Sequence, residues 1–280
     1  MRVSIWSCVI FVVLGLFLAA FYTQSRAQIT QVGRISATGG AGFGFSGEVG
    51  SLLANPAGMA TMKGQGLLLA HHYSHHQPDV SAQALLFARP VSMLHLGASY
   101  VQYTLPEAYY DRLLGAYLGR SFGPQLRMAI GLQFHALKIP AHLEEHRFQI
   151  LMGIQYDWTA DFTMGLVFGP IPLSHSLYTP SVIRSDTERR VMRIGVGSQY
   201  WLGDQVLLRL DQRFFPFNTH AGMEYQLVPD TFTLRMGLST LGLQPAAGVG
   251  FSRSWWSIDV SGVFHQRLGW SPQLDLGVNW

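Results

Sequence analysis

Apolar residues occupy every second position over stretches of about ten residues, and this alternation recurs along most of the chain. In residues 126–135, for example, the even positions are all apolar, whereas the odd positions are polar or small. A repeat of two is that of a β-strand, since a helix returns to the same face every 3.6 residues. The sequence therefore predicts an all-β fold.

The alternating stretches are long for a soluble sheet. We expect strands at 66–74, 80–89, 93–104, 112–122, 126–138, 147–157, 161–168, 188–201, 204–215, 217–227, 231–239, 245–253, 255–265 and 270–280. Their length of about ten residues is that of a tilted strand crossing a bilayer, whereas soluble strands average five or six. They predict a transmembrane antiparallel up-and-down β-barrel of about 14 strands, or about 12 if the boundaries move. A soluble β-sandwich, which also alternates, is the alternative.

Composition narrows the choice further. Hydrophobic residues make up 48% of the 280-residue chain and charged residues only 12%, against about 25% charged residues in ordinary soluble domains. After residue 27, no run of apolar residues is long enough for a membrane-crossing helix. The low charge argues against a soluble enzyme, and the short apolar runs argue against a helical membrane protein.

The first 27 residues have the pattern of a secretory signal. Arg2 precedes an apolar stretch over 9–21, and Ser25 and Ala27 are the small residues of a cleavage site. A retained membrane anchor is the alternative. The only cysteine, Cys8, lies in this segment, so disulfides and thiol chemistry are not expected in the mature chain. We predict that the barrel occupies residues 64–280 and reaches the outer membrane of a Gram-negative cell envelope after signal cleavage.

Residues 28–63 lack the strand pattern and are rich in turn chemistry. The residues that carry this signal are Gly39, Gly40, Gly42, Asn55, Pro56, Ala57 and Gly58. Glycine permits close backbone packing, and Asn-Pro followed by Ala-Gly is typical of turns. We expect a compact hatch inside or under the lumen; a flexible periplasmic leader is the alternative.

The Gly-rich segment ending in 55–60 resembles the N-terminal signature of FadL-type outer-membrane transporters and of PorV/PorQ-type barrels associated with type IX secretion. Residues 222–225, 234–238 and 268–274 are similar to paired strands and a terminal hairpin of the PorV/PorQ branch. The final aromatic residue, Trp280, resembles the assembly signal of outer-membrane barrels. The resemblance implies a fourteen-stranded barrel with an internal hatch. The expected partners are outer-membrane lipid and the barrel-assembly machinery.

Charged residues at inward positions form one candidate functional group. They are Arg127, Arg147, Arg193, Arg209, Asp211, Arg213, Glu224, Arg235, Asp259 and Asp275. An excess of arginine would give a weakly anion-preferring pore, whereas mutual pairing would satisfy buried charge and seat the hatch. We favour pairing, because residues 209, 211 and 213 alternate in sign on one predicted strand.

Histidines gather at the predicted external ends of strands, and His220 is placed among them. The weak metal-binding candidates are His71, His72, His75 and His76. A polar rim without metal is the favoured interpretation. The chain has no nucleophile elbow, P-loop or dinucleotide fingerprint, so we expect no enzyme activity and no cofactor. The weak net charge gives no nucleic-acid footprint.

Two functions are consistent with these features. The first is a FadL-like channel for uptake or diffusion of small hydrophobic compounds, with an apolar path around Phe43, Phe45 and Met59. The second is an accessory barrel of type IX secretion that docks secreted or partner proteins, with the long connection at 169–187 as the docking surface.

Overall fold

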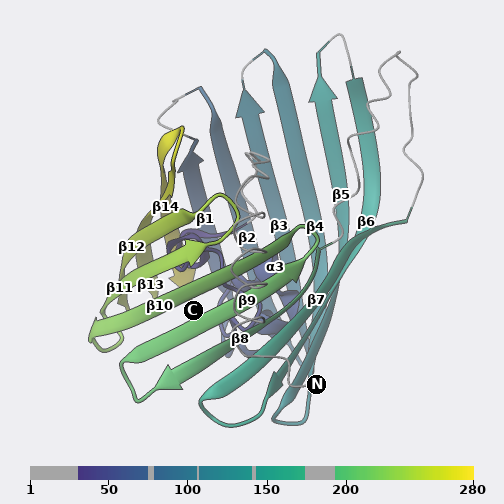
Figure 1. The fold of residues 1–280 in the computed structure, drawn as a ribbon. Helices are drawn as coiled ribbons and strands as arrows, with labels where there is room; N and C mark the ends of the chain where they lie inside the picture. The colour runs from purple at the N-terminus through teal and green to yellow at the C-terminus, as the bar shows by residue number, and fades with distance from the viewer. Residues whose placement is uncertain (1–30, 75–78, 106, 141–142, 174–192) are drawn as a thin grey trace, which may run out of the picture.

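The computed structural model describes residues 31–280 except 75–78, 106, 141–142 and 174–192, and these described residues form fourteen strands around a short helical segment (Figure 1). The strands are β1 (Gly66–Tyr73), β2 (Ser81–Val91), β3 (Leu94–Leu105), β4 (Tyr109–Phe122), β5 (Leu126–Ile139), β6 (Leu143–Asp157), β7 (Phe162–Pro172), β8 (Arg193–Leu202), β9 (Val206–Phe214), β10 (Phe217–Val228), β11 (Phe232–Ser239), β12 (Gln244–Arg253), β13 (Trp256–His265) and β14 (Gly269–Asn279). Among the described residues, no helix is long and apolar enough to cross a membrane.

The sheet closes on itself. Each strand pairs antiparallel with its neighbour in sequence, and β1 pairs with β14 from Gly66 opposite Asn279 to His72 opposite Gln273. Beyond the last strand, the amides of Gln65 and Trp280 each donate to the other's carbonyl at 3.0 Å, which extends the closing pair by one rung. The predicted all-β barrel and its count of fourteen strands are confirmed.

The period of two sorts side chains to the two faces of the wall. On β5, Arg127 and Gln133 point inward and are buried, whereas Ile130 and Leu132 point outward and are 46% and 48% exposed. Neighbouring strands carry the same outward band of apolar side chains, which includes Leu85, Leu96, Leu114, Met152, Leu210, Met236, Val249 and Leu276. Exposed tryptophans lie at both ends of the wall: Trp158, Trp255 and Trp280 at the end where Gly66 and Asn279 lie, and Trp270 at the other end, where β14 begins.

The strands are longer than hydropathy predicts on one side of the wall. β6 begins at Leu143 rather than 147, and β4 begins at Tyr109 rather than 112, so the predicted connection over 139–146 shrinks to 140–142. Hydropathy does not reveal the start of β6, because residues 144–147 are polar on both faces. The backbone of β6 nevertheless pairs with β5 as far as Ile139 opposite Leu143. This side of the barrel therefore stands highest in Figure 1.

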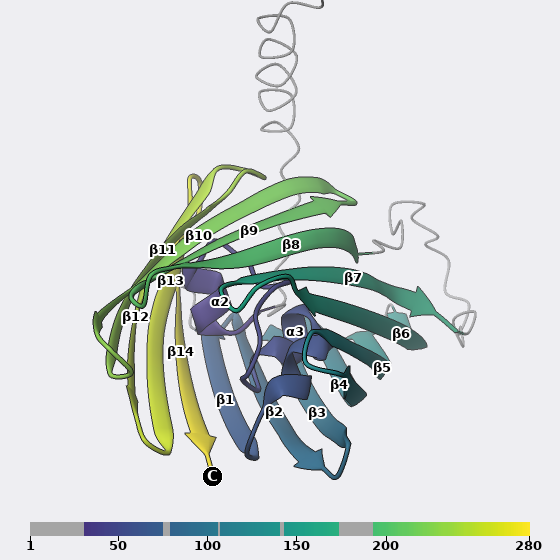
Figure 2. The ribbon, with the colours of Figure 1, turned by 90° about the horizontal axis from the view of Figure 1, so that it is seen from below.

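Residues 31–65, here called the inner segment, lie inside the barrel (Figure 2). They contain α2 (Gly33–Ala37), α3 (Ser51–Ala54) and the 3-10 helix η1 (Pro56–Thr61). α2 contacts β11 to β14, whereas η1 contacts β3 to β6, so the segment spans the lumen from wall to wall. That it closes the lumen as a hatch, and that the barrel proper begins at residue 64, stay predictions. The predicted signal at 1–27 lies outside the described residues.

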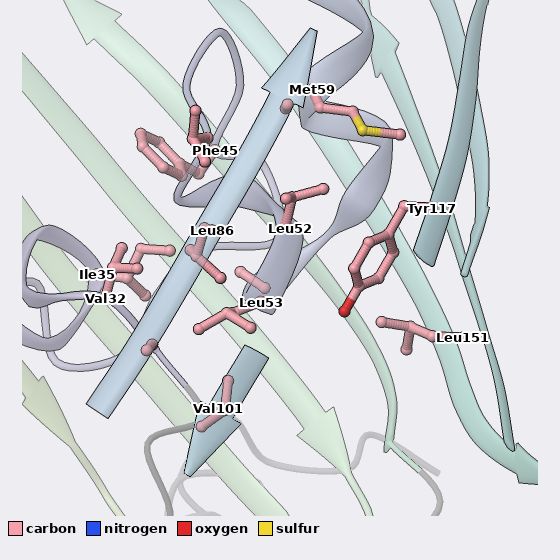
Figure 3. Close-up of a cluster of buried hydrophobic side chains, with 14 of the residues drawn as sticks. Val32, Ile35, Phe45, Leu52, Leu53, Met59, Leu86, Val101, Tyr117 and Leu151 are labelled. Atoms are coloured by element: carbon pink, nitrogen blue, oxygen red, sulfur yellow. The ribbon is translucent and has the colours of Figure 1, made fainter. Parts of the chain in front are cut away.

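The inward face of the wall divides into two parts. The apolar sector comprises the apolar inward residues of β1 to β3, which are Leu68, Ala70, Ala82, Ala84, Leu86, Ala88 and Val101; the same face of β1 and β3 also carries the polar residues His72, His95, Ser99 and Tyr103. The charged sector comprises inward residues of β9 to β14: Arg209, Asp211, Arg213, His220, Glu224, Arg235, Asp259 and Asp275. The hydrophobic core forms between the apolar sector and the inner segment, where Figure 3 shows Leu86 and Val101 among Val32, Ile35, Leu52 and Leu53.

Candidate functional site

The carboxylate of Glu224 is the centre of the charged sector. Arg34 of the inner segment donates to its two oxygens at 2.9 and 3.1 Å, Arg209 lies at 2.6 Å, and Arg235 donates at 3.1 Å. Glu224 is 1% exposed and Arg209 is 4% exposed. Three guanidinium groups, from α2, β9 and β11, thus share one buried carboxylate on β10, an arrangement that ties the inner segment to three wall strands.

Two further carboxylates balance the charge of this cluster. Asp259 pairs with Arg235, and Glu48 pairs with Arg34. Burial alone disfavours the charged form of Arg34, but Glu224 and Glu48 outweigh that effect and raise the pKa of Arg34 above its usual range. Arg34 therefore remains charged at any pH at which the protein is folded, and the cluster holds as many acids as bases.

The phenylalanines of the inner segment lie against these arginines. The guanidinium of Arg209 is 4.7 Å from the centre of the Phe45 ring, and that of Arg34 is 5.2 Å from the same ring. Arg213 lies 5.4 Å from the centre of the Phe43 ring. Both rings are buried and act as cation–π partners of the charged sector. The sequence placed an apolar path around them, whereas the structure places them against guanidinium groups.

Wall carboxylates also bind backbone amides of the inner segment. Asp211 accepts from Gly42 at 2.7 Å and from Phe43 at 3.0 Å, and Asp275 accepts from Gly33 at 2.5 Å. Both carboxylates are almost fully buried. These three hydrogen bonds pair buried backbone amides that would otherwise lack an acceptor, and so they fix the backbone of the Gly-rich stretch.

Carbonyls of the same stretch accept from basic side chains. The ring of His220 lies 2.6 Å from the carbonyl of Gly39, and Arg213 donates to the carbonyl of Gly40 at 3.0 Å. His220 is 5% exposed and faces inward. His220 therefore lies near the end of its strand that begins at Phe217, as the sequence indicates, but its side chain faces inward and is buried, so it does not belong to an exposed rim.

Asn55 organises the other half of the inner segment. Its side chain accepts from the amide of Ala57 at 3.1 Å, which begins η1, and Pro56 occupies the first turn of that helix. The amide nitrogen of Asn55 donates to Phe43 within the segment at 2.8 Å and to Ile154 of the wall at 3.1 Å. The Asn-Pro pair is therefore a turn that also joins the segment to β6.

Gln155 of β6 and Ser121 of β4 complete this attachment. Gln155 donates to the carbonyls of Phe43 and Phe45 at 3.0 and 2.9 Å, and Ser121 donates to the carbonyl of Ala60 at 2.9 Å. Neutral side chains thus hold η1 and the turn before it, whereas charged ones hold α2.

Glycines of the wall make room for the inner segment. Gly222 and Gly237 face each other on β10 and β11, and a Cβ at either position would collide with the backbone of Thr38. Glu224 and Arg235, two positions further along, also face each other. The paired motifs over 222–225 and 234–238 therefore form one surface that receives α2: the glycines admit its backbone and the charges bind Arg34.

The remaining predicted lumen charges lie away from this cluster. Arg127 pairs with Asp157 near one end of the barrel, and Arg147 pairs with Glu145 near the other. The side chain of Arg193 lies outside the described part of the structure. On the same wall as Arg147, Asp111 lies 2.6 Å from His135 and accepts from Tyr109 at 3.2 Å.

The histidine candidates are not brought together. His71 packs edge-to-face with Tyr73 at 4.4 Å between ring centres, while His72 points to the opposite face of β1. His75 and His76 lie outside the described residues. No group of three or more metal-ligating side chains occurs in the part of the chain that the structure describes.

Sequence reasoning missed Arg34, Gln155 and the inward role of His220. A signal existed for Arg34, which is the only charged residue from Val32 to Phe45. A lone arginine in a Gly-rich apolar stretch predicts a buried carboxylate partner. No comparable signal marks Gln155, since polar residues occur at inward positions of most strands.

Solved structures with the same architecture include three transport proteins. The Pseudomonas putida toluene transporter TodX is 11% identical with a TM-score of 0.62, covering 89% of this chain and 96% of that chain. The CymD monoaromatic hydrocarbon channel is 12% identical with a TM-score of 0.61, at 89% and 96% coverage. A Pseudomonas aeruginosa FadL homologue is 12% identical with a TM-score of 0.62, at 89% and 98% coverage.

These comparisons establish the fold as that of FadL-type barrels. No family model matches the chain, and no curated protein matches its sequence. The resemblance read from the N-terminal motif therefore agrees with the three-dimensional architecture, while the solute and the partners of this chain are matters for proposal.

Proposed function

We propose that the protein is an outer-membrane channel for uptake or diffusion of small hydrophobic compounds. The observation that carries this proposal is the apolar sector, a part of the lumen wall with only hydrocarbon side chains at all four inward positions of β2 between Ala82 and Ala88. A pore for ions or sugars would need polar groups along its whole wall, since these solutes lose hydration in an apolar passage.

The outward face supports placement in a membrane. Leucine, methionine and valine side chains point outward around the wall, and exposed tryptophans lie at both of its ends. An apolar band flanked by aromatic residues is the pattern of a lipid-facing barrel. The predicted signal at 1–27 and the assembly signal at Trp280 fit transport to the outer membrane and insertion there by the barrel-assembly machinery.

The fold comparison supports a class of function rather than a particular solute. TodX is described as a toluene transporter and CymD as a monoaromatic hydrocarbon channel. At 11–12% sequence identity, the likeness to these two proteins supports a shared architecture but does not indicate which solute this chain takes. The proposal for this chain is accordingly a class, small hydrophobic compounds.

The test measures uptake by Gram-negative cells that produce the protein, compared with cells carrying an empty vector. Radiolabelled toluene and a radiolabelled long-chain fatty acid serve as apolar solutes, and a labelled disaccharide serves as the polar control. We expect faster initial uptake of at least one apolar solute and unchanged uptake of the disaccharide. Equal uptake of both apolar solutes with and without the protein would contradict the proposal.

The alternative is an accessory barrel of type IX secretion that docks other proteins. The paired motifs over 222–225 and 234–238 favour it, because their likeness is to the PorV/PorQ branch. Extraction of the native protein in mild detergent, followed by mass spectrometry, separates the two functions. Stoichiometric protein companions without an apolar ligand would support the docking function.

A further inference from the structure

The inner segment is held to the wall by different forces on its two sides. On the charged side, Arg34, the backbone of Gly33 and the backbone of Gly42 all bind buried carboxylates. Removing one partner from a buried ion pair costs about 3–5 kcal/mol, because the other charge is left unpaired. The Arg34–Glu224 ion pair, together with the backbone hydrogen bonds of Gly33 and Gly42, therefore holds α2 and the Gly-rich stretch against β9 to β14.

Polar contacts also hold the side that faces β4 and β6. Gln155 and Ser121 donate to three carbonyls of the inner segment, and Asn55 donates to the carbonyl of Ile154. A buried carbonyl that loses its donor has no water to replace it. This attachment bounds the region in which the inner segment can separate from the wall.

Between these two attachments lies the apolar sector. Its side chains have no hydrogen-bonding atoms, and they face Val32, Ile35, Leu52 and Leu53 of the inner segment (Figure 3). Besides the ring of His95 on β3, which lies 3.0 Å from the carbonyl of Met62, hydrophobic burial and dispersion hold this contact. An apolar solute entering this contact replaces one set of apolar neighbours with another, so separation there exposes no unpaired charge.

We propose that solutes pass along the contact between α3 and β1 to β3, here called the apolar seam, while α2 stays fixed to the charged sector. This inference rests on the proposed channel function and names its path. It also names the solute class, which is small, uncharged molecules without strong hydrogen-bonding groups. A charged group in the seam would find no partner on β2 and would have to lose its hydration.

Two engineered disulfides test the seam against the charged side. A Cβ at Gly97 of β3 would meet the Leu52 side chain of α3 at 2.7 Å, so Leu52→Cys with Gly97→Cys locks the seam and removes that clash. A Cβ at Gly33 of α2 would lie 3.1 Å from the hydroxyl oxygen of Ser261, so Gly33→Cys with Ser261→Cys locks the charged side. Cys8 is the only native cysteine and lies in the predicted signal.

Uptake of radiolabelled toluene and of the fatty acid is measured in cells with each pair oxidised and then reduced with dithiothreitol. Mass spectrometry confirms each cross-link, and heat-modifiable gel migration confirms a folded barrel. We expect loss of apolar uptake with the Leu52–Gly97 lock, its recovery on reduction, and unchanged uptake with the Gly33–Ser261 lock. Apolar uptake that persists with the Leu52–Gly97 cross-link, or that is lost with both cross-links, would overturn the proposed path along the apolar seam. Wild-type cells that take up neither solute would overturn the channel function and the seam with it.

A second measurement does not depend on transport or on a cross-link. Leu53→Cys places a thiol in the seam. Ser36→Cys places one on α2, at a position where the native serine hydroxyl donates to the side-chain oxygen of Gln273 on β14 at 3.1 Å. Labelling of each thiol by N-ethylmaleimide is timed in detergent with and without toluene. We expect toluene to slow labelling at residue 53 and to leave residue 36 unchanged. Equal rates with and without toluene at residue 53 would count against the seam.

Discussion

The apolar sector on β1 to β3 and the charged sector on β9 to β14 line one lumen and meet where β1 pairs with β14, yet they hold the inner segment in opposite ways. Ala82, Ala84, Leu86 and Ala88 of β2 offer only hydrocarbon surface, and all four are at most 3% exposed. On the charged side, Glu224 alone contacts three arginines. The first side stabilises by excluding water, and the second by directed contacts between charges that are costly to separate.

The burial of a contact therefore does not by itself determine whether its two surfaces can separate. Both sides are largely buried, but the cost of separation differs because only the charged side leaves unpaired charges behind. A protein that must hold a segment and still admit an apolar molecule can therefore place the two tasks on different strands of one barrel.

The largest effect is expected from Glu224→Gln. The substitution keeps the shape of the side chain but leaves Arg34, Arg209 and Arg235 without their shared carboxylate. We expect a loss of about 3–5 kcal/mol in the free energy of unfolding. Urea titration of the barrel in lipid vesicles, followed by tryptophan fluorescence, measures it. A loss near that of the exposed control Glu144→Gln would remove the distinction between the sectors.

A smaller loss is expected from Leu86→Ala in the apolar sector. Leu86 is fully buried, and truncating such a leucine costs about 2–5 kcal/mol, depending on how far its neighbours collapse into the cavity. The adjacent Leu85 points outward and is 41% exposed, so Leu85→Ala is the matched control. The same urea titration compares them, and equal losses would show that the inner contact adds nothing beyond the outward band.

Gly237→Ala tests the fit of α2 against the charged side without touching a charge. The added methyl would collide with the backbone at Thr38 and Gly39, and overpacking of this kind costs about 1–3 kcal/mol. Gly277→Ala is the control, because its nearest neighbour is the movable hydroxyl of Ser257. If both variants unfold at the same urea concentration, the close approach of α2 to β11 is not a source of stability.

The smallest effect is expected from Lys138→Gln. Lys138 and Glu144 form an ion pair at 3.6 Å, with side chains 58% and 50% exposed. Exposed pairs of this kind contribute about 0.2–1 kcal/mol, and salt screens them. Unfolding of the variant and the parent at low and high salt measures the difference. A loss as large as that of Glu224→Gln would show that charge, rather than buried charge, stabilises this barrel.

Local periodicity was enough to predict most strand boundaries. Residues 126–138 alternate so regularly that the predicted strand ends within one residue of Ile139. The start of β6 was missed because residues 144–147 are polar on both faces, and their pairing with Leu137 and Lys138 is set by the neighbouring strand. Alternation in hydropathy arises because one face of a strand is in an apolar environment and the other in a polar one. It is therefore lost where both faces of a strand are polar.

The candidate site was predictable only in part. The sequence placed Arg209, Glu224 and Arg235 at inward positions, because inward and outward faces follow from counting along a strand. It could not say that these three side chains meet Arg34, which lies about 190 positions away in the chain from Glu224. Such contacts depend on how the inner segment sits in the lumen.

The all-β class, the strand positions and the face to which each side chain points follow from the sequence alone, because these features depend on neighbours along the chain. The tertiary structure adds that the inward face of β1 to β3 is mainly apolar and that of β9 to β14 charged, that His220 contacts the carbonyl of Gly39, and that the paired glycines at 222 and 237 receive the backbone of Thr38. Closing the barrel brings distant residues together, and the contacts made there are properties of the closed sheet and not of any one strand.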